Sequence, residues 1–220
     1  IVAEVGSNHV GDRSLAKETA IAAAEAGADA VKFQMYQAEK LIDGRTPVLK
    51  YIAQTHKTQR ERFKSLQLPE EAFLEFAETV NDLGLIFITT PFYEDAIDFL
   101  DPLMPAIKIA SGDLTNLRLI KRAVSTGKPI LLATGFSPIE EIDWVVAQVP
   151  KEQLILLHCV GAYPTADDEV NLRSIPFLRE RYGVPVGISD HSDGILAPTV
   201  AVALGAQVIE KHFILSKDIP

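Results

Sequence analysis

The sequence predicts a (β/α)8 barrel, a single domain in which eight parallel strands alternate with helices. Three observations support this fold class. Short β-rich apolar runs alternate with amphipathic helical stretches along the whole chain. The chain has 220 residues, and one such barrel commonly needs about 200 to 250. Polar side chains gather where the apolar runs end, which is where the loops of such a barrel converge.

The expected strands are eight short apolar runs. They lie at residues 1–5, 30–34, 85–90, 106–110, 129–134, 154–159, 185–189 and 208–213. Each run is apolar on both faces, which is typical of strands in a parallel sheet that helices cover on the outside.

The expected helices lie between these runs and carry start and stop signals. The helix at 14–27 follows the polar Asp12 and ends at Gly27, and the helix at 68–84 has acidic residues in its first turn and Gly84 at its end. Four more helical patterns lie at 116–127, 137–149, 174–183 and 195–205.

Two irregularities interrupt the alternation. Residues 38–68 form a polar connection that is too long for a plain strand-to-helix link, so we expect a lid or a binding loop. Its basic run HKTQRERFK fits equally well the solvated face of a surface helix. No helical pattern follows the eighth run, so we expect a barrel that is incomplete after its eighth strand and a natural protein that continues.

Composition excludes several classes of function. A net charge of −9 argues against a nucleic-acid or anionic-membrane surface, because both need basic patches. The longest apolar runs are too short to span a bilayer. Nothing before the first strand points to secretion, but the chain does not begin with methionine, so a leader removed from the natural protein stays open. Cys159 is the only cysteine, which excludes an internal disulfide and favours a cytoplasmic location.

Unusual polar residues cluster at the carboxyl ends of the predicted strands, where barrels carry their chemistry. They are, in chain order, Glu4, Lys32, Thr89, Thr90, Lys108, Ser111, Asp113, Thr134, His158, Tyr163, Ser189, Asp190, His191, Glu210 and His212.

Two lysines interrupt apolar strands. Lys32 lies in AVKFQ and Lys108 in AIKIAS, and a buried ammonium group must be paired or meet an anion. Three roles stay open: a salt bridge to Glu4 or Asp113, binding of a phosphate or carboxylate together with neighbouring hydroxyls, and a Schiff base with a carbonyl substrate.

Two histidines lie on or just after neighbouring strands. Alternation places Glu210 and His212 on one face of the eighth strand and turns Lys211 toward the helices. His191 follows the seventh strand, so the two imidazoles are expected at one side of the barrel mouth. Two imidazoles with water or substrate oxygens can hold a divalent transition metal. His158 is expected to pack or hydrogen-bond below the site.

Several stretches, taken in order, resemble the N-acetylneuraminate (sialic acid) synthase family, including its pseudaminate and legionaminate relatives. The resemblance extends over most of the chain, and its most specific part is KIASGDLTN together with SDHS and EKHF. The other matching stretches are IVAEVGSNHVGD, AGADAVKFQ, FITTPF, TGKPILLATG, LLHCVGAYPT, VGISDHSDG and AVALGAQVIEKHF.

The resemblance implies a transferase of sialic acid biosynthesis that joins phosphoenolpyruvate to an N-acetylated hexosamine, such as N-acetylmannosamine, without a Schiff base. A divalent metal, with Mn2+ expected first and Mg2+ or Co2+ also fitting, is implied at His191 and His212, where it would polarise the sugar aldehyde. Residues that match the family's phosphoenolpyruvate site are Lys32, Thr90, Lys108, Ser111 and Ser189.

The resemblance also implies further roles at the reacting atoms. Glu4 matches a carboxylate that carries a proton or orients water. Tyr163, Asp113 and Glu210 match residues around the sugar or the intermediate. Full-length relatives are homodimers in which a small antifreeze-like C-terminal domain covers the partner subunit's active site. We expect residues 1–220 to be the catalytic barrel without that domain.

The chain departs from the family pattern at Gly161, where relatives usually carry serine, threonine or asparagine as a polar contact to phosphoenolpyruvate. Two other interpretations therefore stay open. One is a different barrel enzyme, either another phosphoenolpyruvate-dependent sugar-acid synthase or a lysine Schiff-base aldolase. The other is a non-catalytic sugar-binding barrel. The residues do not identify the acceptor sugar.

Overall fold

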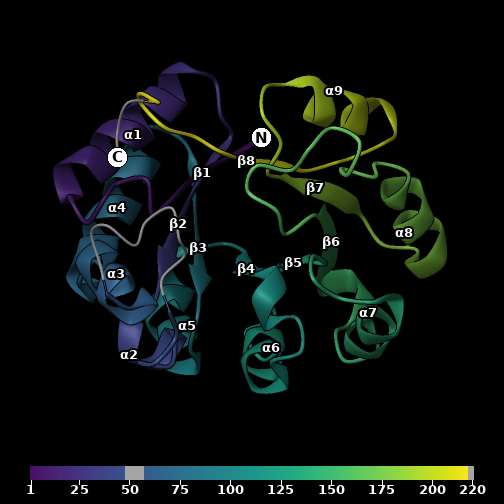
Figure 1. Cartoon of the computed structure of the whole chain (residues 1–220), viewed down its shortest axis with the longest axis horizontal. Coiled ribbons are helices and arrows are strands. Elements are labelled where there is room, and N and C mark those ends of the chain that lie inside the picture. The colour runs from purple at the N-terminus through teal and green to yellow at the C-terminus, as the bar shows by residue number, and fades with distance from the viewer. Residues whose placement is uncertain (48–56, 218–220) are drawn as a thin grey trace.

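The computed structural model describes residues 1–47 and 57–217, and these residues form the predicted barrel (Figure 1). Eight parallel strands are joined in the order β3-β2-β1-β8-β7-β6-β5-β4, and β3 contacts β4, so that the sheet forms a nearly closed barrel. The strands are β1 (Val2–Gly6), β2 (Ala30–Met35), β3 (Ile86–Pro91), β4 (Ile107–Ile109), β5 (Ile130–Ala133), β6 (Leu154–Cys159), β7 (Val186–Asp190) and β8 (Ile209–His212).

Helices surround this barrel, and each predicted helix is present. They are α1 (Arg13–Glu25), α4 (Glu70–Asp82), α6 (Leu117–Val124), α7 (Ile139–Val146), α8 (Ser174–Tyr182) and α9 (Leu196–Ala203). Between β3 and β4 the structure adds α5 (Glu94–Leu100), which the sequence patterns did not reveal. This helix has acidic residues in its first turn, but it is only seven residues long and has neither a side-chain cap nor a glycine at its end, so its signals are weak.

Start and stop residues act as predicted at α1. The carboxylate of Asp12 accepts hydrogen bonds from the backbone N–H groups of Ser14 and Leu15, at 2.7 and 3.2 Å, which satisfies donors that a helix start leaves free. At the other end Gly27 has a φ of +83°, a left-handed conformation that glycine adopts without strain.

Strand alternation decides which side chains face the barrel interior. On β2, Phe33 packs outward and stacks on Phe76 of α4 with ring centroids 4.7 Å apart. Its neighbour Lys32 therefore points inward, and Lys108 on β4 is likewise enclosed. The prediction of two inward lysines is confirmed, because only the outward face of each strand meets the apolar helices.

The long connection contains two helices in its described part, α2 (Ala38–Leu41) and α3 (Gln59–Leu66), while residues 48–56 of the predicted lid lie outside the described residues. Thr58 caps α3 with a capping box, and the Arg60 guanidinium binds the Ile42 carbonyl at 2.8 Å. No residue of α3 is fully buried. Gln59–Leu66 thus forms the surface helix that we weighed against a lid, and lid motion stays a prediction.

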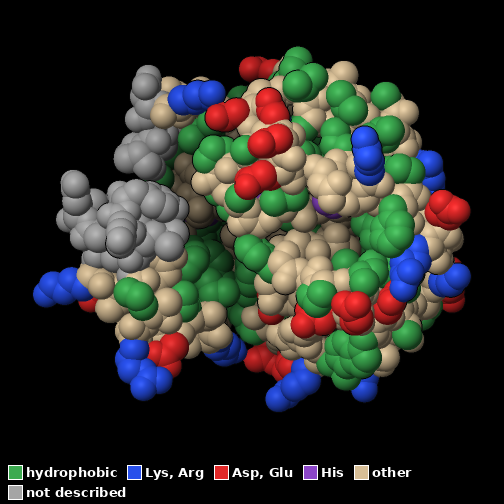
Figure 2. All heavy atoms as spheres, turned by 45° about the vertical axis from the view of Figure 1, so that its right-hand side comes forward, with side chains coloured by type: hydrophobic (Ala, Val, Ile, Leu, Met, Phe, Trp, Pro, Cys, Tyr) green, Lys and Arg blue, Asp and Glu red, His purple; other side chains and the backbone are tan. Residues whose placement is uncertain are grey.

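The end of the barrel is open in the described residues. No helix follows β8 within residues 213–217, and Figure 1 shows the ring of helices interrupted between α1 and α9. Helix α9 accordingly exposes Leu196, Val200 and Val202, whose exposed fractions are 62%, 38% and 57%. Within residues 1–47 and 57–217 the ring of helices is therefore incomplete after β8. None of the helices described could cross a membrane, given their length and polarity. On the face drawn in Figure 2, acidic and basic side chains both lie at the surface.

Candidate active site

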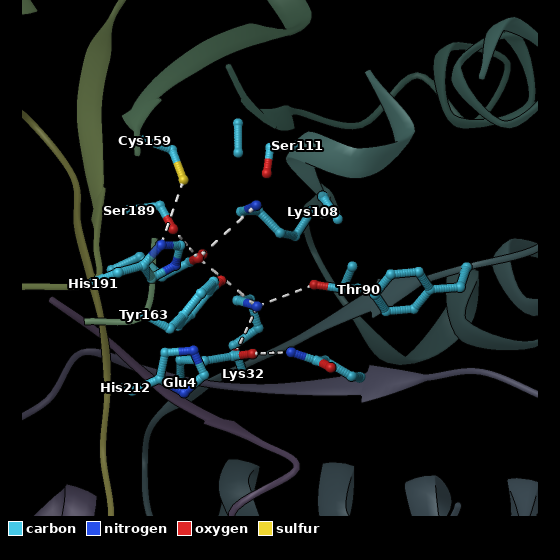
Figure 3. Close-up of a pocket in the computed structure, with 15 residues that line it drawn as sticks. Glu4, Lys32, Thr90, Lys108, Ser111, Cys159, Tyr163, Ser189, His191 and His212 are labelled. Carbon is cyan, nitrogen blue, oxygen red and sulfur yellow. Dashed lines mark hydrogen bonds and ion pairs between the residues drawn. The ribbon is translucent and has the colours of Figure 1, made fainter. Parts of the chain in front are cut away.

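A pocket lies at the carboxyl ends of the strands, at the barrel mouth (Figure 3). Every predicted site residue except Asp113 lines it. These residues are Glu4, Lys32, Thr90, Lys108, Ser111, Tyr163, Ser189, His191, Glu210 and His212. They come from seven different strands or the loops after them, so only closure of the barrel brings them together.

Lys32 is the better paired of the two lysines. Its ammonium nitrogen lies 2.6 Å from Glu4 Oε2 and donates to Thr90 Oγ1 at 3.0 Å. Burial favours the neutral form of Lys32, but Glu210 and Glu4 outweigh it and raise its pKa. The salt bridge to Glu4 that we considered is therefore present, and Lys32 carries a fixed positive charge in the pocket.

Lys108 has weaker partners. Its ammonium nitrogen donates to the Ile109 carbonyl at 3.0 Å and lies 3.9 Å from Glu210 Oε1. Burial lowers the pKa of Lys108, and the nearby Lys32 charge lowers it further. The ion pair with Asp113 that we weighed is not formed. Lys108 is therefore less fully paired than Lys32 and can bind an additional anion more readily.

Two buried carboxylates face these lysines. Burial raises the pKa of Glu4, although Lys32 opposes the shift. Burial also works against ionisation of Glu210, but Lys108 and Lys32 outweigh it and lower the pKa of this group. The Ser189 hydroxyl donates to Glu210 Oε1 at 2.8 Å. Glu210 is therefore the carboxylate that stays charged, and Glu4 is the one that can hold a proton.

The two predicted histidines lie next to each other, with ring centroids 5.9 Å apart. His191 Nδ1 lies 2.7 Å from the Val160 carbonyl, so it carries the hydrogen and leaves Nε2 free to act as a ligand. Desolvation lowers the pKa of His191, and desolvation together with the Lys32 charge lowers that of His212 to about 4, although the His212 side chain also reaches solvent. Both rings are neutral near pH 7, which is the form that binds metals.

The residues fit a divalent metal held by two imidazoles. An imidazole nitrogen binds such an ion at about 2.1 Å, and rings with this separation can share one. In the described part of the chain, no group of three or more His, Cys, Asp or Glu side chains could enclose a metal. The remaining ligands would have to be oxygens of water or substrate, which leaves open positions of the kind that catalytic sites keep.

Tyr163 lies over the histidines at the rim. Its ring stacks on His191 with centroids 3.8 Å apart and meets His212 edge-on at 5.9 Å. Partial burial raises the pKa of its hydroxyl, so it stays protonated and can donate a hydrogen bond. With 64% of its surface exposed, Tyr163 is placed to meet a ligand entering above the histidines.

Asp113 is not brought to the pocket. It lies in a 3-10 turn after β4, and its Oδ1 accepts from the Asn116 amide at 3.2 Å. The turn rotates the carboxylate away from the lining, which strand alternation could not reveal. His158 faces outward, and its Nε2 donates to the Val170 carbonyl at 2.7 Å, in line with its expected packing role.

Sequence reasoning missed two polar lining residues. Gln34 donates to Glu4 Oε1 at 2.6 Å, and the signal was available because Gln34 is two residues after Lys32 on the same strand face. Cys159 Sγ lies 3.8 Å from His191 Nδ1 in the pocket wall. Burial raises the pKa of this thiol, so it acts as a wall and not as a nucleophile.

Gly161 is covered by an aromatic ring. A Cβ atom added at Gly161 would lie 1.9 Å from Cζ of Phe136, so no side chain fits there while this ring is in place. Phe136 has a φ of +63° and is 73% exposed, an unusual backbone conformation for a bulky residue. The Phe136 ring therefore occupies the space that a side chain at position 161 would enter.

The sequence matches the NeuB family over residues 20–220. An uncharacterized protein of Methanocaldococcus jannaschii is 45% identical over 99% of this chain and 63% of its own length. The N,N'-diacetyllegionaminic acid synthase of Legionella pneumophila is 41% identical over 100% of this chain and 65% of its length. A pseudaminic acid synthase of Campylobacter jejuni is 38% identical over 100% and 66%. The chain thus spans a little under two thirds of the curated relatives it matches.

Solved structures have the same fold. An N-acetylneuraminic acid synthetase of Leptospira borgpetersenii, in complex with citrate, superposes with a TM-score of 0.84 at 33% identity, over 98% of this chain and 73% of that one. A putative spore coat polysaccharide biosynthesis protein E of Chromobacterium violaceum gives 0.86 at 30% identity, over 99% and 66%. A 3-deoxy-D-arabino-heptulosonate 7-phosphate synthase of Thermotoga maritima, at 21% identity, over 96% and 73%, and a TM-score of 0.68, shares the barrel fold.

Proposed function

Because the chain belongs to the NeuB family, we propose that its barrel is the catalytic part of a synthase that condenses phosphoenolpyruvate with an N-acetylated hexosamine. One observation carries the proposal. Two buried lysines and two neutral histidines face one pocket at the barrel mouth. The first pair suits an anion and the second suits a metal and an aldehyde, which are the two needs of this reaction.

The lysine side of the pocket would hold phosphoenolpyruvate. Lys32 and Lys108 supply positive charge, and hydroxyls nearby can donate to phosphate or carboxylate oxygens. These hydroxyls belong to Thr90, Ser111 and Ser189. The pocket also contains two carboxylates that already face the lysines, so an incoming anion must compete with them, and protonation of Glu4 would ease that competition.

The histidine side would hold the divalent metal, for which Mn2+ is the first choice and Mg2+ or Co2+ also fit. His191 and His212 are its ligands in this proposal, and the ion when bound would withdraw electrons from the sugar aldehyde. Tyr163 lies against both rings and would orient the sugar by a hydrogen bond from its hydroxyl.

In the proposed reaction the methylene carbon of phosphoenolpyruvate forms a bond to the aldehyde carbon of the open-chain sugar. The aldehyde oxygen takes up a proton, water adds to the carbon that carries phosphate, and the bond from that carbon to the phosphate oxygen breaks. One phosphoenolpyruvate, one sugar and one water thus give a nine-carbon 2-keto sugar acid and one phosphate. Glu4, whose pKa burial raises, would supply or orient the proton.

An ionic role for Lys32 is favoured over a Schiff base by its contacts, whereas burial lowers the pKa of Lys108, so Lys108 is the lysine at which a Schiff base has to be tested. Lys32 is engaged by Glu4 and Thr90 and stays charged, whereas a Schiff base needs a free neutral amine. The expected cytoplasmic location and the homodimer of the complete protein stay predictions from the sequence.

Phosphate release tests the proposal. The protein is given phosphoenolpyruvate, Mn2+ and, one at a time, a panel of N-acetylated and bis-acetamido hexoses. We expect release that needs all three components and that is abolished by His212→Ala, and the best sugar identifies the acceptor. No release with any sugar would overturn the synthase, and borohydride trapping of a lysine–substrate bond would favour an aldolase instead.

A further inference from the structure

Strands β7 and β8 bring the two histidines together through three successive pairs of residues. Ser189 pairs with Glu210 and Asp190 pairs with Lys211 in the parallel register. The residues that follow are the histidines of the site, His191 directly after the end of β7 and His212 as the last residue of β8. Because side chains alternate along a strand, the first and third pairs face the pocket, and the middle pair faces away from it.

The middle pair is a dense polar contact. Lys211 Nζ donates to Asp190 Oδ2 at 2.5 Å and to the Ser192 carbonyl at 2.7 Å. The other carboxylate oxygen, Asp190 Oδ1, accepts from the Ser192 backbone N–H at 3.0 Å and from its hydroxyl at 2.7 Å. The contact therefore joins the two strands and also fixes the turn that contains His191.

Burial makes this contact hard to replace. The Asp190 side chain is 1% exposed and the Lys211 side chain 26%, so the carboxylate has little access to water if the ammonium group leaves. Loss of one partner of a buried pair strands the other charge. The Asp190–Lys211 ion pair thus holds the ends of β7 and β8 at one separation, and little water can reach the buried carboxylate to replace the ammonium group.

The two imidazoles depend on this separation to different degrees. His191 has its own anchor, the hydrogen bond to the Val160 carbonyl. Within the described residues His212 has ring contacts with Tyr163 and His191 but no hydrogen bond to its imidazole. The position of the His212 ring therefore depends on the backbone of β8, a strand of four residues that ends at His212.

We infer that the Asp190–Lys211 ion pair is a positioning device for a divalent cation at His191 and His212, because it fixes the distance between the strand ends that carry the two imidazoles. The inference rests on the proposed function, in which these histidines hold the metal. Both oxygens of the Asp190 carboxylate are already bound by Lys211 and Ser192, and neither residue of the pair lines the pocket of Glu4 and Lys32, so Asp190 and Lys211 are positioning residues and not ligands. Partners behind metal ligands typically contribute about 10- to 100-fold to metal affinity.

The test compares Mn2+ binding with phosphate binding in the absence of sugar. The variant Asp190→Asn/Lys211→Met removes both charges, so that no carboxylate is stranded, and Lys211→Arg keeps the ion pair. The matched control is Lys128→Met. Lys128 is also 26% exposed and also binds a carboxylate and a carbonyl, at 2.8 and 2.9 Å, but it precedes β5 at the opposite end of the barrel.

Mn2+ affinity is read from the loss of the free-ion signal in electron paramagnetic resonance, and inorganic phosphate affinity by calorimetry. We expect the double variant to bind Mn2+ about 10- to 100-fold more weakly with phosphate affinity unchanged. Lys211→Arg should bind Mn2+ nearly as the parent does. Lys128→Met should lower the free energy of unfolding and leave Mn2+ affinity unchanged.

Two results would overturn the inference. One is parental Mn2+ affinity in the double variant, and the other is an equal loss of Mn2+ and phosphate, which would indicate general damage to the mouth. If the double variant does not fold, Asp190→Asn alone, which keeps the acceptor for Ser192, decides the question by the same comparison. Failure of the proposed metal site looks different, because the parent protein would then bind Mn2+ no better than His212→Ala.

Discussion

The two lysines of the pocket differ in how far they are already paired. Lys32 has Glu4 at 2.6 Å and Thr90 at 3.0 Å, whereas the nearest carboxylate oxygen to Lys108 is that of Glu210 at 3.9 Å. An incoming anion can therefore gain a full charge-assisted contact from Lys108 with little rearrangement, but it must share Lys32 with Glu4. The same residue type thus has two different roles.

The variant Lys108→Met should bind phosphoenolpyruvate about 10- to 100-fold more weakly, because a charge-assisted contact contributes about 1.5 to 3 kcal/mol. Mn2+ affinity should be unchanged, since the histidines lie at the ends of β7 and β8 and Lys108 lies on β4. Calorimetry with each ligand measures both effects. Parental phosphoenolpyruvate affinity in this variant would remove Lys108 from the anion site.

Positions 136 and 161 should behave as one unit. Gly161→Asn alone places an atom where the Phe136 ring lies and should displace this ring, which is 73% exposed, at a cost in stability of about 0.5 kcal/mol. Adding Phe136→Ala should restore most of that stability. Urea unfolding of the two single variants and the double variant gives the coupling energy. Additive effects would show that the ring and the glycine are independent.

At the scale of elements, the alternation of side chains along the strands explains which residues reach the pocket. On β2, Lys32 and Gln34 face the pocket while Phe33 packs on α4. Ser189 and Glu210 repeat this arrangement on β7 and β8. A strand that is apolar on one face and polar at the inner end of the other carries a functional group without losing its packing surface.

Helix α3 is the element whose motion the lid prediction concerns. It has no fully buried residue, so few contacts oppose local opening. We expect hydrogen exchange of the amides in Gln59–Leu66 to slow when phosphoenolpyruvate, Mn2+ and sugar bind together. Amides of α4, which is anchored by Phe73 and Phe76, are the control and should not change. Equal exchange of α3 with and without ligands would leave it as a surface helix only.

For the whole molecule, four histidines whose pKa values are lowered in the folded chain make stability depend on pH. Burial lowers the pKa of His9 and of His212 to about 4 each, and also lowers the pKa values of His158 and His191. The unfolded chain, with values near 6.5, therefore binds more protons than the folded one at mildly acid pH. Stability from these groups is fully present above about pH 6.5 and is lost as pH falls toward 4.

The variant His9→Asn tests this effect away from the pocket. His9 Nδ1 accepts the Gly11 N–H at 3.0 Å, and an asparagine oxygen can do the same. The loss of unfolding free energy between pH 7.5 and pH 5 should be smaller in the variant by about 2 kcal/mol. Urea unfolding at both pH values measures it. An unchanged difference would mean that His9 does not resist protonation in the folded state.

The sequence by itself determined the barrel and most of its site. Strand and helix periods are local properties of the chain, and a parallel barrel places the ends of all strands at one mouth, so residues as distant as Lys32 and His212 could be assigned to one pocket before any coordinates. Gln34 was also within reach of this reasoning, because it shares a strand face with Lys32.

Only the tertiary structure decided features that depend on exact distances between distant segments. The short turn after β4 removes Asp113 from the pocket, and the Phe136 ring fills the space beside Gly161. The pairing of Asp190 with Lys211 behind the histidines depends on the register of β7 against β8. Sequence periodicity specifies the face of a strand on which a residue lies, whereas register, turn geometry and packing specify which residue from another segment meets it there.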